Sequence, residues 1–230
     1  MPTDYISYQE SNYFIKIVND YLDQSPNLKP FYNRFPTLNN FSEQIKEKSL
    51  NYNQVNRSIL VTELLKQYSN VETSDLTNQS INLLSKNSTF TITTGHQLNL
   101  FTGPLYFLYK IISTINLCKQ LKTEYPKNDF VPIYWMATED HDFDEINYFN
   151  FKGIKIRWTK QNPSGPVGRF DTTDLKIVYD VIEKKLGNSE NAIYLKKLFS
   201  KAYLNNHNLA DATRCLANEL FKNNSFSQIV

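Results

Sequence analysis

The chain has 230 residues, and 25 Lys and Arg against 23 Asp and Glu give it a formal net charge of +2. This near balance provides no strong field for nucleic acid or for an anionic membrane. Hydrophobic residues make up 40% of the chain and aromatic residues 14%, which excludes a disordered or fibrous protein. No run approaches the roughly 20 apolar residues of a membrane helix, and the N-terminus lacks a signal-peptide pattern, so we expect a globular, cytoplasmic protein.

The first part of the chain has a helical pattern. Residues 1–87 contain no glycine, and their apolar residues recur at helical spacing. Three prolines between residues 25 and 36 disfavour helix in the residues that precede them. The sequence therefore predicts an N-terminal helical section, interrupted by an extended linker or wrapping segment.

The pattern then changes to that of an α/β unit. Residues 88–97, STFTITTGHQ, are β-branched and alternating, which is typical of a strand that enters a turn at Gly95. Pro104 and the apolar stripe after it predict a helix to about Leu121, and the apolar run 130–137 predicts a second, buried strand. A crossover of this kind makes the strands parallel, so the loops after both strands are expected at one sheet edge, where open α/β sheets bind ligands.

The remaining chain predicts, in order, strand-like residues 147–159, a loop at 162–170, and helices at about 173–187, 190–205 and 208–222. The last residues, SFSQIV, have the pattern of a strand that begins, so we expect the natural protein to continue. Cys118 and Cys215 lie in helix-like apolar patterns, which predicts buried thiols and neither a disulfide framework nor a zinc site.

The turn after the first predicted strand is one candidate site. Gly95 is followed by His96 and Gln97, and such a turn offers backbone N–H groups and an imidazole to phosphate oxygens. The motif is short and equally fits a turn residue whose imidazole is satisfied by the backbone. Lys110, on the next helix, fits either a phosphate contact or a solvated helix face.

A second candidate is EDHDFDE, residues 139–145, in which five carboxylates and one histidine repel one another unless a cation, amine or polar ligand compensates. Glu139, Asp140 and His141 follow the buried strand directly and are expected to point inward. Asp142 and the acids after it equally fit solvated loop residues or a helix cap. A hydrolytic metal centre is not favoured, because the chain has three histidines and His207 lies far away in a polar segment, so no metal ligand is assigned.

The third candidate is SGPVGRF, where Gly165, Gly168 and Arg169 form a flexible turn that bears a guanidinium. The guanidinium suits a carboxylate or a phosphate, but an ordinary hairpin with a surface arginine fits the pattern equally well. The sequence contains no Walker-type loop, no GxGxxG and no GxSxG, and neither cysteine lies beside a histidine-bearing loop.

Three segments in this order, TTGHQLNLFTGPLYFLYKI, VPIYWMATEDHDFDEIN and SGPVGRF, resemble the bacillithiol biosynthesis cysteine-adding enzymes, which are cysteine ligases. The resemblance rests mainly on residues 91–170 and concerns the N-terminal part of those proteins. It implies an α/β fold with a Rossmann-like parallel sheet, similar to the cores of class I aminoacyl-tRNA synthetases and nucleotidyltransferases. An N-terminal helical section, residues 1–87, would precede the first part of this core, residues 88–230, with a connecting insertion at about 147–225.

The resemblance also implies an activity and partners. Family members are thought to join cysteine to glucosaminyl-malate through an amide bond, giving the low-molecular-weight thiol bacillithiol. They are longer than this chain and dimerise through a C-terminal coiled coil, which this chain is expected to lack. ATP is the expected energy source, because condensing a carboxylate with an amine is uphill in water.

The resemblance assigns roles to the candidate residues. Gly95-His96-Gln97 matches the position of the His-Ile-Gly-His signature of class I synthetases, with a single histidine, so cysteine's carboxylate would be activated near His96 and Gln97. Asp140 and His141 are further catalytic candidates. The substrate-binding candidates are Gly95, Lys110, Glu139, Asp142 and Arg169, with Arg169 holding the malate carboxylates and the acids holding or deprotonating the amine.

Other functions remain open from the sequence. One is an ATP-dependent nucleotidyltransferase that acts on another small molecule, and another is a non-catalytic ligand-binding or assembly module. Metal-dependent hydrolysis is the third alternative.

Overall fold

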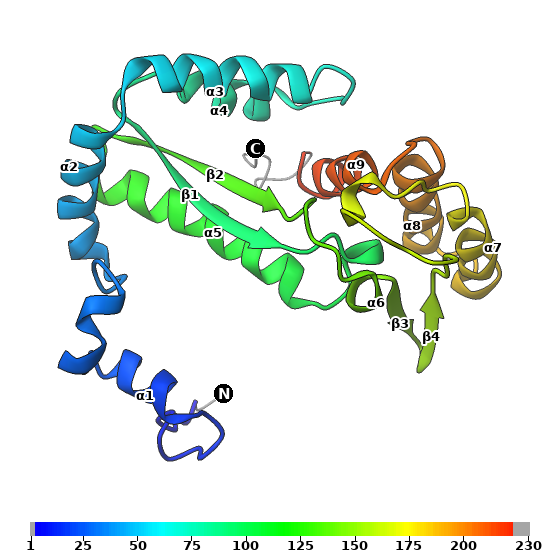
Figure 1. Cartoon of the computed structure of the whole chain (residues 1–230), viewed down its shortest axis with the longest axis horizontal. Helices are drawn as coiled ribbons and strands as arrows, with labels where there is room; N and C mark the ends of the chain where they lie inside the picture. The colour runs from blue at the N-terminus through cyan, green and yellow to red at the C-terminus, as the bar shows by residue number, and fades with distance from the viewer. Residues whose placement is uncertain (1–2, 223–230) are drawn as a thin grey trace. The chain divides into compact units, whose positions relative to one another are not determined.

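The structure, a computed structural model, describes residues 3–222, and the chain divides into two compact units, Met1–Asn51 and Tyr52–Val230, which are considered separately (Figure 1). The first unit contains α1 (Lys16–Leu22), η1 (Pro26–Phe31), η2 (Leu38–Asn40) and α2 (Phe41–Asn51). The second contains α3 (Gln54–Gln67), α4 (Asp75–Leu83), β1 (Thr89–His96), η3 (Leu100–Thr102), α5 (Tyr106–Glu124), β2 (Asp129–Met136), α6 (Phe143–Ile146), β3 (Tyr148–Phe151), β4 (Ile154–Arg157), η4 (Val167–Arg169), α7 (Leu175–Leu186), α8 (Glu190–Phe199), η5 (Ser200–Leu204) and α9 (Leu209–Phe221). The division into functional domains at residue 87 stays a prediction.

The proline-rich segment of the first unit is more folded than its sequence suggests. The prediction of an extended linker is wrong for Pro26–Phe31, which forms the 3₁₀ helix η1 with the N–H of Leu28 bonded to the carbonyl of Ser25 at 3.0 Å. Proline is tolerated at a first helical position because its missing N–H would have no partner there. Pro26 therefore begins a short helical turn, and Pro30 lies inside it.

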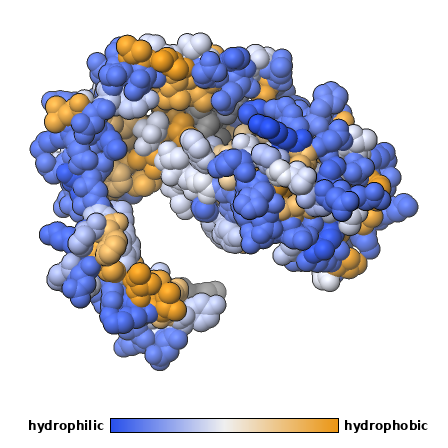
Figure 2. Space-filling view, viewed as in Figure 1, coloured by the Kyte–Doolittle hydropathy of each residue, from blue (hydrophilic) through white to orange (hydrophobic). Residues whose placement is uncertain are grey.

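Aromatic contacts organise the rest of this unit. The ring of Tyr21 lies 5.2 Å from the rings of both Tyr32 and Phe35. Figure 2 also shows apolar side chains gathered over α1, where Ile15 and Ile17 are exposed.

The second unit is built on the parallel pairing of β1 with β2. The register runs from Thr89 opposite Asp129 to His96 opposite Met136. The helix α5 connects the two strands, so the predicted strand, helix and parallel strand are confirmed.

Helices cover both faces of these strands (Figure 1). On one face, Ile111 and Ile115 of α5 pack with Tyr134 of β2. On the other, Val131 of β2 packs with Ile81 of α4 and with partly buried side chains of α3. Successive residues of a strand point to opposite faces, so the near-continuous apolar run of β2 is what a strand between two helical layers requires.

The largest buried hydrophobic cluster is formed mainly by residues that follow β1 and β2 in the chain. The antiparallel β3 and β4 and the helices α6 to α9 enclose it, with Trp158, Phe199 and Tyr203 among its fully buried members. The predicted helices over 173–187 and 208–222 are confirmed by α7 and α9. The predicted helix 190–205 is α8, which passes at Ser200 into the π-helix η5. The expected strand SFSQIV lies outside the described residues.

Both cysteines are free thiols, with Cys118 buried and Cys215 partly buried. Burial raises the pKa of Cys118 to about 12 and also raises that of Cys215. His207 is exposed, as expected. Among residues 3–222, no helix is both long and apolar enough to cross a membrane.

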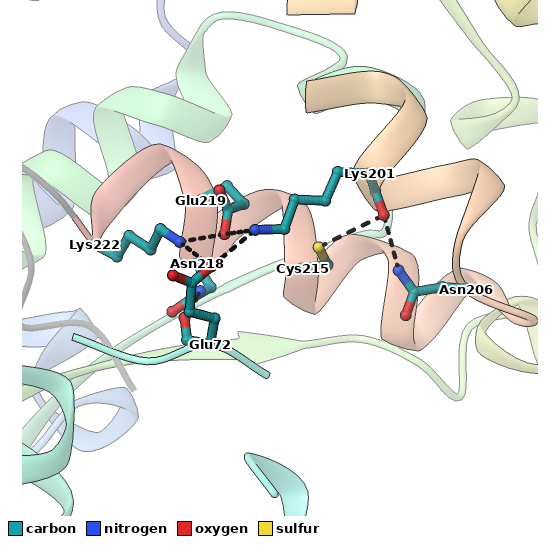
Figure 3. A network of polar contacts seen from close by, with 7 residues as sticks. All are labelled: Glu72, Lys201, Asn206, Cys215, Asn218, Glu219 and Lys222. Atoms are coloured by element: carbon teal, nitrogen blue, oxygen red, sulfur yellow. Dashed lines mark hydrogen bonds and ion pairs between the residues drawn. The ribbon is translucent and has the colours of Figure 1, made fainter. Parts of the chain in front are cut away.

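An ion-pair network joins η5, α9 and the segment before α4 (Figure 3). The ammonium groups of Lys201 and Lys222 each contact the carboxylates of both Glu72 and Glu219, at 2.7–3.0 Å. Asn218 adds a bond from its Nδ2 to the carbonyl of Glu72 at 2.8 Å. The network thus connects the start of η5 with the end of α9 and with the segment that precedes α4.

This network makes a pH-dependent contribution to stability. Hydrogen bonds from Lys222 and Lys201 lower the pKa of Glu72 to about 2. A carboxyl group whose pKa is depressed on folding stabilises the folded state above its unfolded value, near 4.5, and loses that contribution as pH falls toward 2. We therefore expect Glu72→Gln to lower the melting temperature near pH 7, and the difference from the wild type to shrink near pH 3.

Thermal unfolding followed by circular dichroism measures both differences. Glu63→Gln is the control, because the ion pair of Glu63 with Lys66, at 3.7 Å, is exposed and an exposed pair is worth little. If the melting temperature of Glu72→Gln lies equally far below that of the wild type near pH 7 and near pH 3, the prediction is contradicted.

Candidate functional site

The strand register brings two predicted candidate sites together. Gly95 lies opposite Trp135 and His96 opposite Met136, and the N–H of Ala137 donates to the carbonyl of His96 at 3.2 Å. The turn after β1 and the acidic loop after β2 therefore share one edge of the sheet, as expected.

Gln97 connects the two loops directly. Its Nε2 donates to Oδ2 of Asp140 at 2.9 Å and to Oε2 of Glu145 at 2.7 Å. One neutral amide thus uses both of its protons to hold two carboxylates that would otherwise repel each other. The sequence pattern predicts Gln97 and Asp140 as site residues but not Glu145, although Glu145 ends the EDHDFDE motif.

Asp140 is the half-buried acid of the loop. The bond from Gln97 lowers the pKa of its carboxyl group, with help from the backbone N–H groups of Asp142 and His141, which donate to Oδ1 at 3.1 and 2.7 Å. Asp140 is therefore ionised at neutral pH. The expectation that Glu139 and His141 also point inward is wrong, because both are exposed, whereas Asp140 contacts Gln97.

Asp142 has a structural partner. Its Oδ1 accepts the backbone N–H of Glu145 at 3.2 Å and caps the N-terminus of α6, which was one of the two alternatives open from the sequence. Its side chain remains exposed, so a substrate contact stays a prediction.

His96 lies against aromatic rings at the end of β1. Its imidazole stacks on Tyr106 with centroids 5.0 Å apart and 16° between planes, and it meets the edge of Phe107 at 5.5 Å. Burial and the charge of Lys110 lower its pKa, so the imidazole is neutral at pH 7. Within the described residues, Nε2 of His96 is buried and has no hydrogen-bond partner.

Lys110 completes this turn. Although the residue is exposed on α5, its ammonium donates to the carbonyl of Gly95. It thus lies at the turn and not on a distant helix face. Gly95, His96, Gln97 and Lys110 line a cavity of about 410 Å³ together with Tyr106, Trp135, Ala137 and Glu139.

The third motif docks on the acidic loop through its backbone. The N–H of Val167 donates to the carbonyl of Asp140 at 2.7 Å, and the N–H of Gly168 donates to the carbonyl of Thr138 at 3.0 Å. A Cβ on Gly168 would lie 2.7 Å from Cβ of Thr138 and 2.8 Å from its oxygen, so only glycine fits this approach.

Arg169 follows this contact and is exposed. It lines a second cavity of about 480 Å³, with Thr138, Glu139, Pro166, Gly168, Asn208, Ala210 and Asp211. Glu139 lines both this cavity and the one at His96. The exposed carboxylate of Glu139 therefore lies between a cavity lined by Lys110 and a cavity lined by Arg169.

Several lining residues were missed from the sequence. Tyr106 and Trp135 read as apolar positions of a helix and a strand, yet both are more than half exposed and line the cavity at His96. Their positions in the sequence could have indicated a place in the site, because Trp135 immediately precedes the last residue of β2 and Tyr106 begins α5. Among residues 3–222, no group of three or more His, Cys, Asp or Glu side chains is arranged to hold a metal ion.

Parallel strands joined by a helix, with polar turns at their carboxyl ends, define a Rossmann-like α/β domain. The family model "Bacillithiol biosynthesis BshC, N-terminal Rossmann-like domain" matches residues 1–226. The chain therefore belongs to the BshC family of bacillithiol biosynthesis, which confirms the resemblance drawn from its three motifs.

Relatives of this chain are named "Putative cysteine ligase BshC". The one from Flavobacterium johnsoniae is 63% identical over 223 residues, which cover 97% of this chain and 42% of the relative. The one from Christiangramia forsetii is 51% identical over 224 residues, covering 96% and 42%. The one from Bacillus thuringiensis is 34% identical over 144 residues, covering 62% and 26%. The chain thus spans less than half the length of these relatives.

The close approach at Gly168 gives a test of the site's architecture. We expect Gly168→Ala to destabilise the protein by about 1–3 kcal/mol, as overpacking does, which corresponds to a melting temperature lower by about 2–12 °C. Gly95→Ala is the matched control, because a Cβ there would meet its nearest neighbour at 3.7 Å, an ordinary contact.

Thermal unfolding of both variants measures the effect. Equal melting temperatures for Gly168→Ala and Gly95→Ala would show that the Val167–Arg169 turn does not need the close approach to Thr138.

Proposed function

We propose that this domain carries substrate-binding and catalytic groups of a carbon–nitrogen ligase, which joins the carboxylate of cysteine to the amine of glucosaminyl-malate in bacillithiol biosynthesis. The names of the relatives support a cysteine ligase. The observation that carries the proposal is the position of Glu139 between two cavities, one lined by His96 and Lys110 and the other by Arg169.

This arrangement suits two substrates of different charge. Glucosaminyl-malate has two carboxylates, and the guanidinium of Arg169 is the group best shaped to bind one of them. Cysteine and the phosphates of a nucleotide would occupy the other cavity, beside the Lys110 ammonium and the neutral imidazole of His96. The reacting carboxyl and amine would then meet near Glu139.

The reaction needs an activated carboxyl group, and ATP is the proposed source. An oxygen of the cysteine carboxylate would attack phosphorus of ATP, giving an acyl phosphate and ADP, or an acyl adenylate and pyrophosphate. The amine nitrogen would then attack the carbonyl carbon, a C–N bond would form, the C–O bond to the phosphoryl group would break with release of phosphate or AMP, and the amine proton would pass to Glu139. Lys110 would balance the developing negative charge, as preorganised donors do, whereas both protons of the Gln97 amide are already engaged with Asp140 and Glu145.

The wider setting belongs to the same proposal. We propose that the whole protein acts in the cytoplasm on small molecules and forms a homodimer through a coiled coil, without nucleic acid or membrane partners. Asp140, held by Gln97, would orient the acidic loop, and His141 and Asp142, both exposed, would be available to the substrate amine.

Binding can be measured before turnover. We expect titration calorimetry on the whole protein to detect ATP, cysteine and glucosaminyl-malate when each is added separately, and this chain alone to bind glucosaminyl-malate. A folded whole protein that binds none of the three would contradict the assignment of substrates. Turnover of ATP with a different acceptor would favour a nucleotidyltransferase instead.

Replacing Arg169 tests the second cavity. Loss of a charge-assisted hydrogen bond weakens binding by about 1.5–3 kcal/mol, so we expect Arg169→Ala to raise the Kd for glucosaminyl-malate about 10–100-fold and to leave the Kd for ATP unchanged. Arg157→Ala, which removes an exposed arginine of β4, is the matched control. Equal affinity of both variants for glucosaminyl-malate would rule out the role of Arg169.

Replacing Glu139 tests the position between the cavities. Because a general base contributes about 10²–10⁴-fold to rate, we expect Glu139→Gln to lower kcat by that factor with little change in either KM. Glu139 is exposed, so folding should be retained, which circular dichroism checks. Unchanged kcat would exclude Glu139 as the proton acceptor.

A further inference from the structure

The segment between Gln97 and α5 has an unusual backbone. Phe101 and Thr102 both have positive φ, at 49° and 71°, a region that non-glycine residues rarely adopt and β-branched ones least of all. Gly103 follows at φ 55°, and a Cβ there would lie 2.6 Å from Cβ of Asn99. Backbone strain of this kind persists only where the surrounding structure fixes the conformation, and it is frequent at functional sites.

The group that fixes this turn comes from another part of the fold. The hydroxyl of Tyr203 accepts the backbone N–H of Phe101 at 2.8 Å, and Tyr203 is fully buried. Its ring packs on Phe199 with centroids 4.6 Å apart, and Phe199 contacts the Phe101 ring at 5.2 Å. Tyr203 therefore contacts the strained residue through its backbone and, by way of Phe199, through its side chain.

Tyr203 is itself held in place. It lies in the π-helix η5, a geometry that is rare and often occurs at functional positions. Nδ2 of Asn206 donates to the carbonyls of Lys201 and Ala202, at 3.3 and 2.7 Å, and the Lys201 ammonium enters the network with Glu72 and Glu219 (Figure 3). The turn of helix that carries Tyr203 is thus anchored on both sides.

The strained turn separates the two walls of the cavity at His96. On its N-terminal side, the N–H of Asn99 donates to the carbonyl of Gln97 at 2.9 Å. On its C-terminal side, α5 begins and supplies Tyr106 and Lys110. A change in the turn would alter the position of Gln97 relative to these two residues.

We propose that Tyr203 is a positioning residue, whose hydroxyl fixes the Leu100–Gly103 turn and thereby sets the spacing between Gln97 and the Tyr106–Lys110 side of the cavity. It touches no proposed substrate and acts through the backbone of Phe101. The proposal concerns the shape of the cavity, and it rests on the proposed ligase function only where turnover is the readout.

The test compares Tyr203→Phe with Ile182→Val in the whole protein. The first variant keeps the ring and removes the hydroxyl. The second removes one methyl group from the same buried cluster, on α7, and controls for a general loss of stability. The readouts are amide hydrogen exchange over Phe101–Gly103, the NMR titration of the His96 imidazole, and kcat and KM for the condensation.

For Tyr203→Phe we expect the Phe101 amide to exchange about tenfold faster, because its hydrogen bond to the Tyr203 hydroxyl is lost and local opening then exposes it. We also expect a shifted His96 titration and a kcat about tenfold lower with unchanged KM for glucosaminyl-malate. Ile182→Val should change none of these readouts, even if its melting temperature falls equally.

Two results would overturn the proposal. One is Phe101 exchange in Tyr203→Phe equal to that in Ile182→Val, and the other is faster exchange with an unchanged His96 titration. If the wild type does not ligate cysteine, the proposed function is wrong, and exchange and titration alone decide the role of Tyr203. If Tyr203→Phe does not fold, Asn206→Ala loosens η5 while keeping the hydroxyl, and the same two readouts apply with the same outcomes.

Discussion

Parallel pairing of β1 with β2 places His96 opposite Met136, and the positions of the candidate site residues follow from that register. A shift of one residue would turn every strand side chain to the opposite face. It would also separate Gln97 from Asp140, whose hydrogen bond joins the two loops. The helical layers on both faces, which bury Val131 on one side and Tyr134 on the other, fix this register.

Much of this arrangement could be predicted from the sequence, because it depends on local pattern. The alternation before Gly95 and the apolar run that follows residue 129 are typical of strands, and a helix between two strands implies parallel pairing. The expected meeting of the GHQ turn with the acidic loop followed from that topology alone. Recognition of three motifs in order then identified the family.

Other features depend on side-chain and backbone contacts that no local pattern contains. The motif EDHDFDE does not reveal that Asp140 and Glu145 contact Gln97 while Glu139 and His141 face solvent. Nor does it reveal that Gly168 must be a glycine because of Thr138, which lies in another loop. The contact between Tyr203 and Phe101 joins residues about a hundred positions apart, so only the folded chain shows it.

The two thiols of this domain have a consequence for a protein of thiol metabolism. Attack on a disulfide requires a thiolate, and both Cys118 and Cys215 remain protonated at neutral pH because burial raises their pKa. Under the proposed function this domain binds cysteine, a thiol that forms disulfides when it is oxidised. With its own sulfur atoms kept neutral inside the fold, it resists forming mixed disulfides with the molecules that it binds.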